Sequence, residues 1–246
     1  MVKIISLITK FILVLLCTLL FASCNYSINL KSITGSGTVV KENRAVTDSF
    51  KSIELSNAID LELEQSHKTE IIVEADDNLI SNIRTRIENG VLIIDCDYDS
   101  FLDVKSKKVI VRMPQIEELK ASSASSMTSK NILKGDEISI RASSAANIKL
   151  ELEYDRINAK ASSASTIILY GLSLDLTTNA SSGSEIDAND LLANEVKAGA
   201  SSGASVIIHP IVNLKAKASS GGSIQYSKTP QSMERKASSG GSIDKI

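Results

Sequence analysis

The sequence contains no tryptophan and few other aromatic residues, which together make up 4% of its 246 positions. Apolar residues nevertheless account for 43% of the chain, so a buried core is possible. That core must be built from Ile, Leu, Val and Ala. Such a composition suits thin, repetitive β-coils better than a wide globular interior.

Cysteine and histidine are scarce, with three and two residues respectively. Cys17 lies in an N-terminal segment that is expected to be removed and Cys24 is expected to be modified, which leaves Cys96 without a disulfide partner. The aspartates on either side of Cys96 are expected to raise the pKa of its thiol and make it inert. His67 and His209 have unlike surroundings and no G-x-S-x-G motif is present, so a Ser–His nucleophile is not expected.

Neither sign of charge is in clear excess. The chain has 27 basic and 29 acidic residues, a formal net charge of −2. No basic tract stands out, and nucleic acid is therefore not an expected partner.

The N-terminal segment is typical of an export signal. Lys3 and Lys10 precede an apolar run over residues 11–21, and this run is short for a membrane span. The following Phe21-Ala22-Ser23-Cys24 resembles the lipobox of bacterial lipoproteins, in which the Cys receives diacylglycerol and becomes the first residue. We therefore expect a lipoprotein signal peptide over 1–23, lipidation of Cys24 and a tether over 24–34. The alternatives are an ordinary signal peptide and an uncleaved anchor.

The most informative feature is a repeat that occurs seven times. Each block reads Ala-Ser-Ser followed by Ala or Gly, and a large apolar residue stands six positions after the first Ala. A near-fixed interval of 18 to 21 residues is typical of a solenoid. The blocks begin at Ala121, Ala142, Ala161, Ala180, Ala200, Ala218 and Ala237, and the apolar partners are Met127, Ile148, Ile167, Ile186, Val206, Ile224 and Ile243.

Apolar residues before each block keep the same phase, which argues against a Ser-rich linker. Examples are Ile138 and Ile140 before the second block, and Leu174 and Leu176 before the fourth. Alternation of this kind places one set of side chains on one face of a strand. The Ser-Ser-Gly segments are natural corners because Gly permits positive φ and Ser can bond to nearby backbone. A regular solenoid is expected over 116–246.

Residues 35–115 have strand patterns without the fixed period. The continuous apolar runs at 71–73 and 91–94 predict strands that are covered on both faces. Glu88-Asn89-Gly90 predicts a hairpin turn, and Pro114 is expected to end a strand. The expected fold is all-β, a right-handed parallel β-helix or β-solenoid with rungs of about 19 residues and a less regular N-terminal half.

Three motifs precede the coils: Gly35-Ser36-Gly37, Phe50-x-x-Ile53-x-Leu55-Ser56, and Val73-Glu74-Ala75-Asp76-Asp77-Asn78-Leu79. Together with the Ala-Ser-Ser-Gly coils, they resemble the head GIN domain family, which is described as auto-transporter adhesins and as a domain of unknown function. The resemblance covers residues 35 to 243. It implies a parallel β-helix-like fold on exported bacterial proteins, often lipoproteins, and it offers no catalytic residues to carry over.

The most site-like cluster is Asp95, Asp97 and Asp99, which would share one face of a strand and could offer oxygen ligands to Ca²⁺. Ser100 and Ser106 stand where a calcium loop needs Gly and Glu. A solvated polar face is the simpler interpretation, so these residues are a weak metal candidate.

A second acidic group, Glu185, Asp187 and Asp190, lies within one expected rung. The equivalent positions one rung on carry no acids, so the paired carboxylates of a glycosidase are not expected. Met127 and Met233 occupy apolar positions of the repeat and are expected to fill the core.

The sequence therefore predicts a non-enzymatic protein without a cofactor, anchored to membrane through Cys24 in the bacterial cell envelope, with the outer membrane the expected location. Adhesion or ligand binding is the expected function, with a glycan or an envelope protein as partner. The alternatives are a self-assembling structural module and, less favoured, a carbohydrate-active β-helix enzyme. Because the terminal block at Ile243 is as regular as the others, a second copy is expected to cover that end as a homodimer.

Overall fold

The computed structural model describes residues 10–12, 14 and 31–246. The expected signal peptide lies mostly outside the described residues, as do Cys24 and most of the tether. None of the helical residues described belongs to a helix long and apolar enough to cross a membrane. The elements are β1 (Ser32–Thr34), β2 (Val39–Arg44), β3 (Ser52–Leu55), β4 (Asp60–Gln65), β5 (Glu70–Asp76), the 3-10 helix η1 (Ile80–Asn82), β6 (Ile83–Glu88), β7 (Val91–Cys96), β8 (Ser100–Leu102), β9 (Lys107–Met113), β10 (Glu118–Ala121), β11 (Ser126–Ser129), β12 (Leu133–Ala142), β13 (Asn147–Ala161), β14 (Thr166–Ala180), β15 (Glu185–Ala200), β16 (Ser205–Ala218), β17 (Ser223–Tyr226), β18 (Ser232–Ala237) and β19 (Ser242–Lys245).

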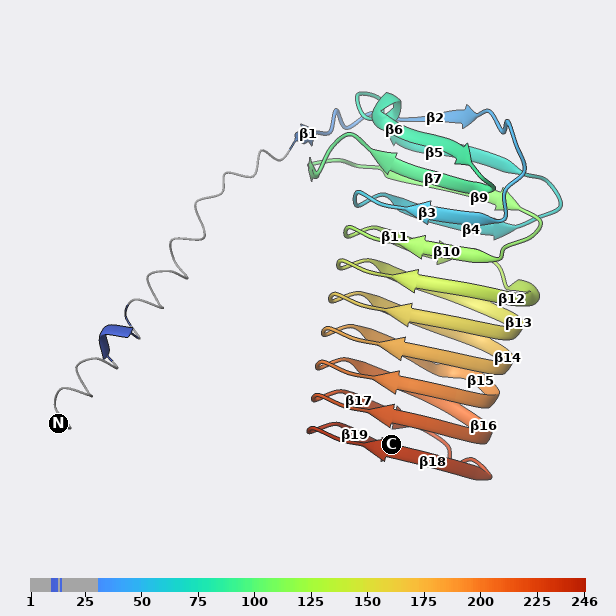
Figure 1. Ribbon diagram of the computed structural model, residues 1–246. Helices are drawn as coiled ribbons and strands as arrows, with labels where there is room; N and C mark the ends of the chain where they lie inside the picture. Colours follow the sequence, from blue (N-terminus) through green and yellow to red (C-terminus); the bar gives the residue numbers. More distant parts are fainter. Residues whose placement is uncertain (1–9, 13, 15–30) are drawn as a thin grey trace. The chain divides into compact units, whose positions relative to one another are not determined.

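The predicted β-solenoid is confirmed, with stacked parallel rungs of about 19 residues and a less regular N-terminal part. Strands β13 to β16 each run through most of a rung and pair in parallel with the rungs before and after. The pairing joins equivalent positions, such as Ile167 with Ile186 and Ala161 with Ala180. Figure 1 shows the rungs from β10 to β19 stacked in chain order, with their tight turns aligned along one edge.

The predicted core positions are nearly all correct. All seven apolar residues at the sixth position are buried, from Met127 (0% exposed) to Ile243 (8%). The prediction is wrong for Leu174, which is 52% exposed. Ser173 turns inward instead, with its hydroxyl 2.9 Å from the carbonyl oxygen of Asp175, and Leu172 and Leu174 on either side face outward.

The predicted corners are tight turns in which two successive residues have positive φ. Ser144 and Ala145 have φ of 50° and 62°, and Ser202 and Gly203 have 52° and 70°. Two left-handed residues in succession are typical of a type I′ turn. The turns also bond to one another, since the N–H of Ala145 donates to the carbonyl of Ser163 at 3.0 Å. The rungs are therefore hydrogen-bonded through their corners as well as through their strands.

One rung lies earlier than the sequence repeat predicts. Strands β3 and β4 pair in parallel with β10 and β11, which places Leu55 opposite Ala121 and Leu61 opposite Met127. The turn between them has Asn57 and Ala58 at φ of 58° and 54°. Leu-Ser-Asn-Ala thus replaces Ala-Ser-Ser-Ala, with the apolar partner again at the sixth position. The regular register begins at residue 52 rather than at 116.

Beyond this rung, β7 and β9 pair in parallel with β3 and β4, and antiparallel strands then continue the sheet. Strands β2, β5 and β9 pair antiparallel, and β6 and β7 form the predicted hairpin through Asn89 and Gly90. Strand β9 ends at Met113, directly before Pro114, as predicted. These strands lie at the opposite end of the stack from β18 and β19 (Figure 1).

The terminal block differs from its neighbours at one position. Arg235 pairs with the buried Ala216 and so occupies a core-facing position in the last rung of the chain. Its Nη1 lies 3.4 Å from the carbonyl oxygen of Ile243, across the end of the core. An inward-pointing charge of this kind disfavours the addition of another strand or another copy.

The turns yield a stability prediction. Ala164 has a φ of 60°, which costs an L-residue about 1–2 kcal/mol, whereas glycine adopts this conformation freely. We expect Ala164→Gly to raise the free energy of unfolding by about 1 kcal/mol and Gly203→Ala to lower it by about 1 kcal/mol. A methyl group on Gly203 would meet nothing within 4 Å, so the second change reports backbone strain alone. Urea unfolding followed by circular dichroism measures both, and the opposite order of stabilities would contradict the turn geometry.

Candidate functional site

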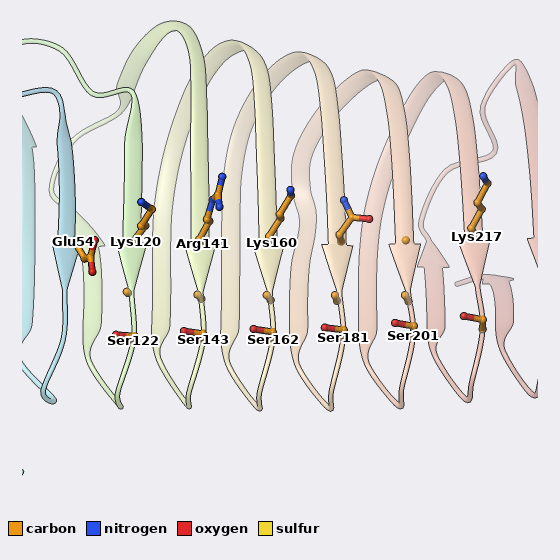
Figure 2. A pocket seen from close by; sticks show the side chains of 18 residues that line it. Glu54, Lys120, Ser122, Arg141, Ser143, Lys160, Ser162, Ser181, Ser201 and Lys217 are labelled. Atoms are coloured by element: carbon orange, nitrogen blue, oxygen red, sulfur yellow. The ribbon is translucent and has the colours of Figure 1, made fainter. Parts of the chain in front are cut away.

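A groove of about 730 Å³ runs along the solenoid beside the tight turns, and we call it the serine groove. Most rungs contribute the same three positions: the first Ala of the block, the residue before it and the first Ser after it. Because equivalent residues pair in register, each position forms a row along the stack of rungs, as Figure 2 shows. The lining residues are Glu54, Lys120, Ala121, Ser122, Arg141, Ala142, Ser143, Lys160, Ala161, Ser162, Asn179, Ala180, Ser181, Gly199, Ala200, Ser201, Lys217 and Ser219.

The first row consists of serine hydroxyls that no other group of the described chain engages. It comprises Ser122, Ser143, Ser162, Ser181, Ser201 and Ser219. No hydrogen bond involves any of these hydroxyls within residues 31–246, and the five labelled in Figure 2 point the same way along the stack. They are therefore available to a ligand.

A different serine in three of the blocks supports the fold instead. Ser125, Ser165 and Ser184, four positions after the first Ala, are buried. The hydroxyl of Ser184 donates to the carbonyl of Ser181 at 2.8 Å, and that of Ser165 donates to the carbonyl of Ala142 at 2.9 Å. The serines of one block thus divide between hydrogen bonding within the turn and lining the groove.

The second row is largely cationic. The residues that pair in succession along it are Glu54, Lys120, Arg141, Lys160, Asn179, Gly199, Lys217 and Lys236. Figure 2 shows the side chains of Lys120, Arg141, Lys160 and Lys217 extending in the same direction from successive strands. Glu54, at one end, is the single carboxylate among the lining residues.

A parallel row two positions earlier adds Lys197 and Lys215. Lys120 and Arg141 share the carboxylate of Glu118, with N–O distances of 3.2 and 3.4 Å. Across the part of the chain that the structure describes, no carboxylate lies within ion-pair distance of the other four lysines, which are Lys160, Lys197, Lys215 and Lys217.

The lysines at the end of the two cationic rows lower the pKa of a neighbouring carboxylate, Glu234. The hydrogen bond from Lys236 holds the pKa of Glu234 below its ordinary value, and the nearby charges of Lys215 and Lys217 act in the same direction. The serine groove is therefore a strip of positive potential on a chain whose net charge is −2.

The charge balance of the whole chain does not reveal this basic strip. A signal for it is nevertheless present in the sequence, since the residue directly before the first Ala is Lys or Arg in five of the seven blocks. Only the in-register stack makes these residues neighbours, because successive cations of this row are 19 to 57 positions apart along the chain.

The acidic residues singled out in the sequence lie elsewhere. Asp95 is nearly buried and accepts hydrogen bonds from Arg84 and Arg86, each at 2.7 Å. Burial alone would raise its pKa, but the two guanidinium groups outweigh this effect and hold it below the ordinary value. Asp97 pairs with Arg84. The two arginines thus engage the carboxylates of Asp95 and Asp97, and among the described residues no three His, Cys, Asp or Glu side chains are placed to hold a metal.

The remaining candidates are separated. His67 is exposed in the turn between β4 and β5, whereas His209 lies on β16. Asp187 accepts a hydrogen bond from the backbone of Asn189 in its own rung. Cys96 is buried, and this burial raises the pKa of its thiol, with a further contribution from the charge of Asp97.

A smaller hollow of about 370 Å³ lies where the rungs bend away from the groove, and it contains the largest group of exposed leucines. Leu172, Leu174 and Leu192 line it and are 52%, 52% and 38% exposed. Ile211 lies in the same hollow. Four apolar side chains thus share this patch, which has no row of cations.

Two of the motifs that carry the family resemblance meet in space. The buried carboxylate of Asp76 accepts hydrogen bonds from the backbone N–H groups of Gly37, Lys105 and Ser106, at 2.9, 3.0 and 2.9 Å. Gly35 lies so close that a Cβ there would be 2.5 Å from the same carboxylate. We call this arrangement the Asp76 clasp, and it fastens the segment before β2 to β5.

The fold and the groove define a class of protein: a parallel β-solenoid that presents a long, repetitive surface. Within this class, the family model described as "Putative auto-transporter adhesin, head GIN domain" matches residues 49–230, and the chain belongs to that family. A comparison with the curated proteins finds no match. The description of the family is adhesin-like and names no enzyme activity, which suggests a protein of the cell envelope or surface.

Solved structures show the same fold. A protein of Bacteroides fragilis described as a putative adhesin has a TM-score of 0.79 at 18% identity, over 87% of this chain and 100% of that one. A putative adhesin of Parabacteroides merdae has a TM-score of 0.70 at 21% identity, over 88% and 99%. A Parabacteroides distasonis protein described as a putative lipid binding protein has a TM-score of 0.71 at 22% identity, over 88% and 100%.

The Asp76 clasp yields a pH prediction. Burial would raise the pKa of Asp76, but the three backbone donors outweigh it and hold the pKa below its ordinary value. The charged carboxylate therefore stabilises the fold above about pH 4, and this stabilisation is lost as the pH falls through the lowered pKa. We expect Asp76→Asn to lower the free energy of unfolding by about 1–3 kcal/mol at pH 7 and by less at pH 3. The exposed neighbour provides the control, since Asp77→Asn should stay within about 0.5 kcal/mol of wild type. A difference for Asp76→Asn that does not change with pH would show that its charge is not involved.

Proposed function

We propose that this protein is a non-enzymatic lipoprotein of the bacterial cell envelope that binds an elongated ligand along the serine groove. The observation that carries this proposal is the row of six serine hydroxyls that have no hydrogen-bond partner among the described residues, repeated rung after rung beside a row of cations. A repeated arrangement of this kind suits a ligand that is itself repetitive or extended. A glycan chain or an extended segment of an envelope protein has that form.

Binding suits the groove better than catalysis. Glu54 is the single carboxylate of its lining, at one end, and glycoside hydrolysis needs two carboxylates on opposite sides of the bond that is cleaved. The groove also presents equivalent groups in successive rungs, whereas a nucleophile is needed once. The adhesin description of the family supports a role in adhesion.

Self-association is the weaker alternative. A second copy that covered the terminal rung would have to accommodate Arg235, which lies across the end of the core. The charge would lose water on contact and would need a carboxylate from the other copy.

The membrane anchor belongs to the same proposal. The lipobox-like Phe21-Ala22-Ser23-Cys24 supports cleavage after residue 23 and lipidation of Cys24, and residues 24–34 would link the lipid to the solenoid. The outer membrane is the proposed location, with the serine groove presented to a ligand outside the bilayer.

Blocking the groove tests the binding function. We expect Ser162→Phe combined with Ser181→Phe to fill two successive rungs of the groove and to lower affinity at least about tenfold for ligands found on glycan arrays and in envelope-protein overlays. The control is Ser205→Phe, at the start of β16 after the turn and not among the residues that line the groove, which should bind as wild type does. Circular dichroism checks that all three proteins fold. A ligand that binds both variants equally well does not occupy the groove, and that result would contradict the proposal.

Partitioning in detergent tests the anchor. We expect the protein expressed in a bacterium that processes lipoproteins to enter the detergent phase, because several acyl chains on one Cys bind membranes firmly. Cys24→Ser should shift it to the aqueous phase. If the two proteins partition alike, Cys24 is not lipidated.

A further inference from the structure

We propose that the ligand of the serine groove is an acidic polysaccharide, a linear sugar polymer that carries carboxylate groups. This inference rests on the proposed function and specifies its ligand class. It depends on the charge pattern and on the hydroxyl row, which are independent features of the same rungs.

The two outward rows beside the turns contain no acid between Glu118 at one end and Glu234 at the other. Over the five rungs between them, the rows carry Arg141, Lys160, Lys197, Lys215 and Lys217, and the other members are Ser139, Asn158, Thr177, Asn179 and Gly199. Four of these five rungs therefore present at least one cation. Since neighbouring rungs lie about 4.8 Å apart, the cations are spaced as densely as the charges of a polyanion with one carboxylate per sugar.

These cations are available for binding. Four of the lysines have exposed side chains, namely Lys160, Lys197, Lys215 and Lys217. Among the described residues, no carboxylate oxygen lies within 4 Å of their Nζ atoms. A ligand carboxylate would therefore not have to displace a salt bridge. Each such contact is weak when exposed, but a polymer makes several at once and the contributions add.

The serine row indicates that this polyanion is a sugar. In each rung, the hydroxyl lies two residues from the cationic position, on the other side of a buried Ala, at a separation of about 6.6 Å along the strand. A carboxylate-bearing sugar ring has both a negative group and hydroxyls that exchange hydrogen bonds with serine. Single-stranded nucleic acid is bound instead by combining cations with aromatic side chains on which the bases stack. The lining of this groove contains no aromatic residue among those described and consists of hydroxyls, cations, an amide, small residues and the carboxylate of Glu54 at one end.

A second hollow joins the two cationic rows. It has a volume of about 270 Å³, and Thr177, Lys197, Lys215 and Lys217 line it together with Asn179, Ala198 and Gly199. The side chain of Asn179 lies against Gly199, since a Cβ at Gly199 would be 2.7 Å from Oδ1 of Asn179. A sugar seated there contacts cations of both rows.

The experiment is isothermal titration calorimetry of the purified protein with polygalacturonate at about 20 mM and about 200 mM salt, with a linear neutral glucan and a single-stranded DNA oligonucleotide as comparison ligands. We expect polygalacturonate to bind, with an affinity that falls as salt rises. The triple variant Lys160→Gln, Lys197→Gln, Lys217→Gln should lower that affinity about tenfold or more. The matched triple variant Lys68→Gln, Lys228→Gln, Lys245→Gln changes the net charge equally but lies outside the groove, and it should change the affinity less than about twofold.

Several outcomes would overturn the inference. Equal losses in the two triple variants would mean that overall charge, not the groove, attracts the polymer. Tighter binding of DNA than of polygalacturonate, or no binding of polygalacturonate at low salt, would show the ligand class to be wrong. Binding of the neutral glucan that survives the groove triple but is lost in Ser162→Phe/Ser181→Phe would overturn the acidic ligand while leaving the proposed groove function intact.

Discussion

The in-register parallel pairing of one rung with the next is the constraint on which the rest of this structure depends. Each rung closes through a turn with two left-handed residues, and the backbone of that turn bonds to the turns on either side. No rung could shift by one residue without moving its apolar side chains to the surface. The same register therefore determines the core, the position of the turns and the alignment of the surface rows.

The binding properties of the surface in such a molecule depend on rows of equivalent residues rather than on single residues. A Lys placed before Ala in one block becomes part of a strip only because the next rung places its own Lys about 4.8 Å away. This is how a chain with a net charge of −2 can present a basic groove. Buried Ala residues between the two rows hold the hydroxyls and the cations apart at a constant separation.

The two ends of the stack are managed differently from its middle. At one end, antiparallel strands and the Asp76 clasp tie down the segment that precedes β2. At the last rung, Arg235 takes a position that is apolar or small in the other rungs and turns its guanidinium toward a backbone carbonyl. A parallel stack leaves unpaired backbone groups on its outermost strands, and such strands can pair with other chains. The antiparallel strands at one end and Arg235 at the other both disfavour that pairing.

The sequence by itself determined the repeat, its period, the buried sixth position and the left-handed corners, because these follow from local pattern and from the conformational preferences of Gly and Ser. It also indicated the hairpin at Asn89–Gly90 and the end of β9 before Pro114. The tertiary structure alone decided that Leu55-Ser56-Asn57-Ala58 contains the turn of an earlier rung and that Leu174 faces outward. It also decided that Arg84 and Arg86 bind the carboxylate of Asp95. It further decided that the first serine of six blocks lines the groove and that cations 19 to 57 positions apart along the chain form one strip. The physical reason is that local pattern fixes which face of a strand is buried, whereas the neighbours of an exposed side chain depend on how distant segments stack.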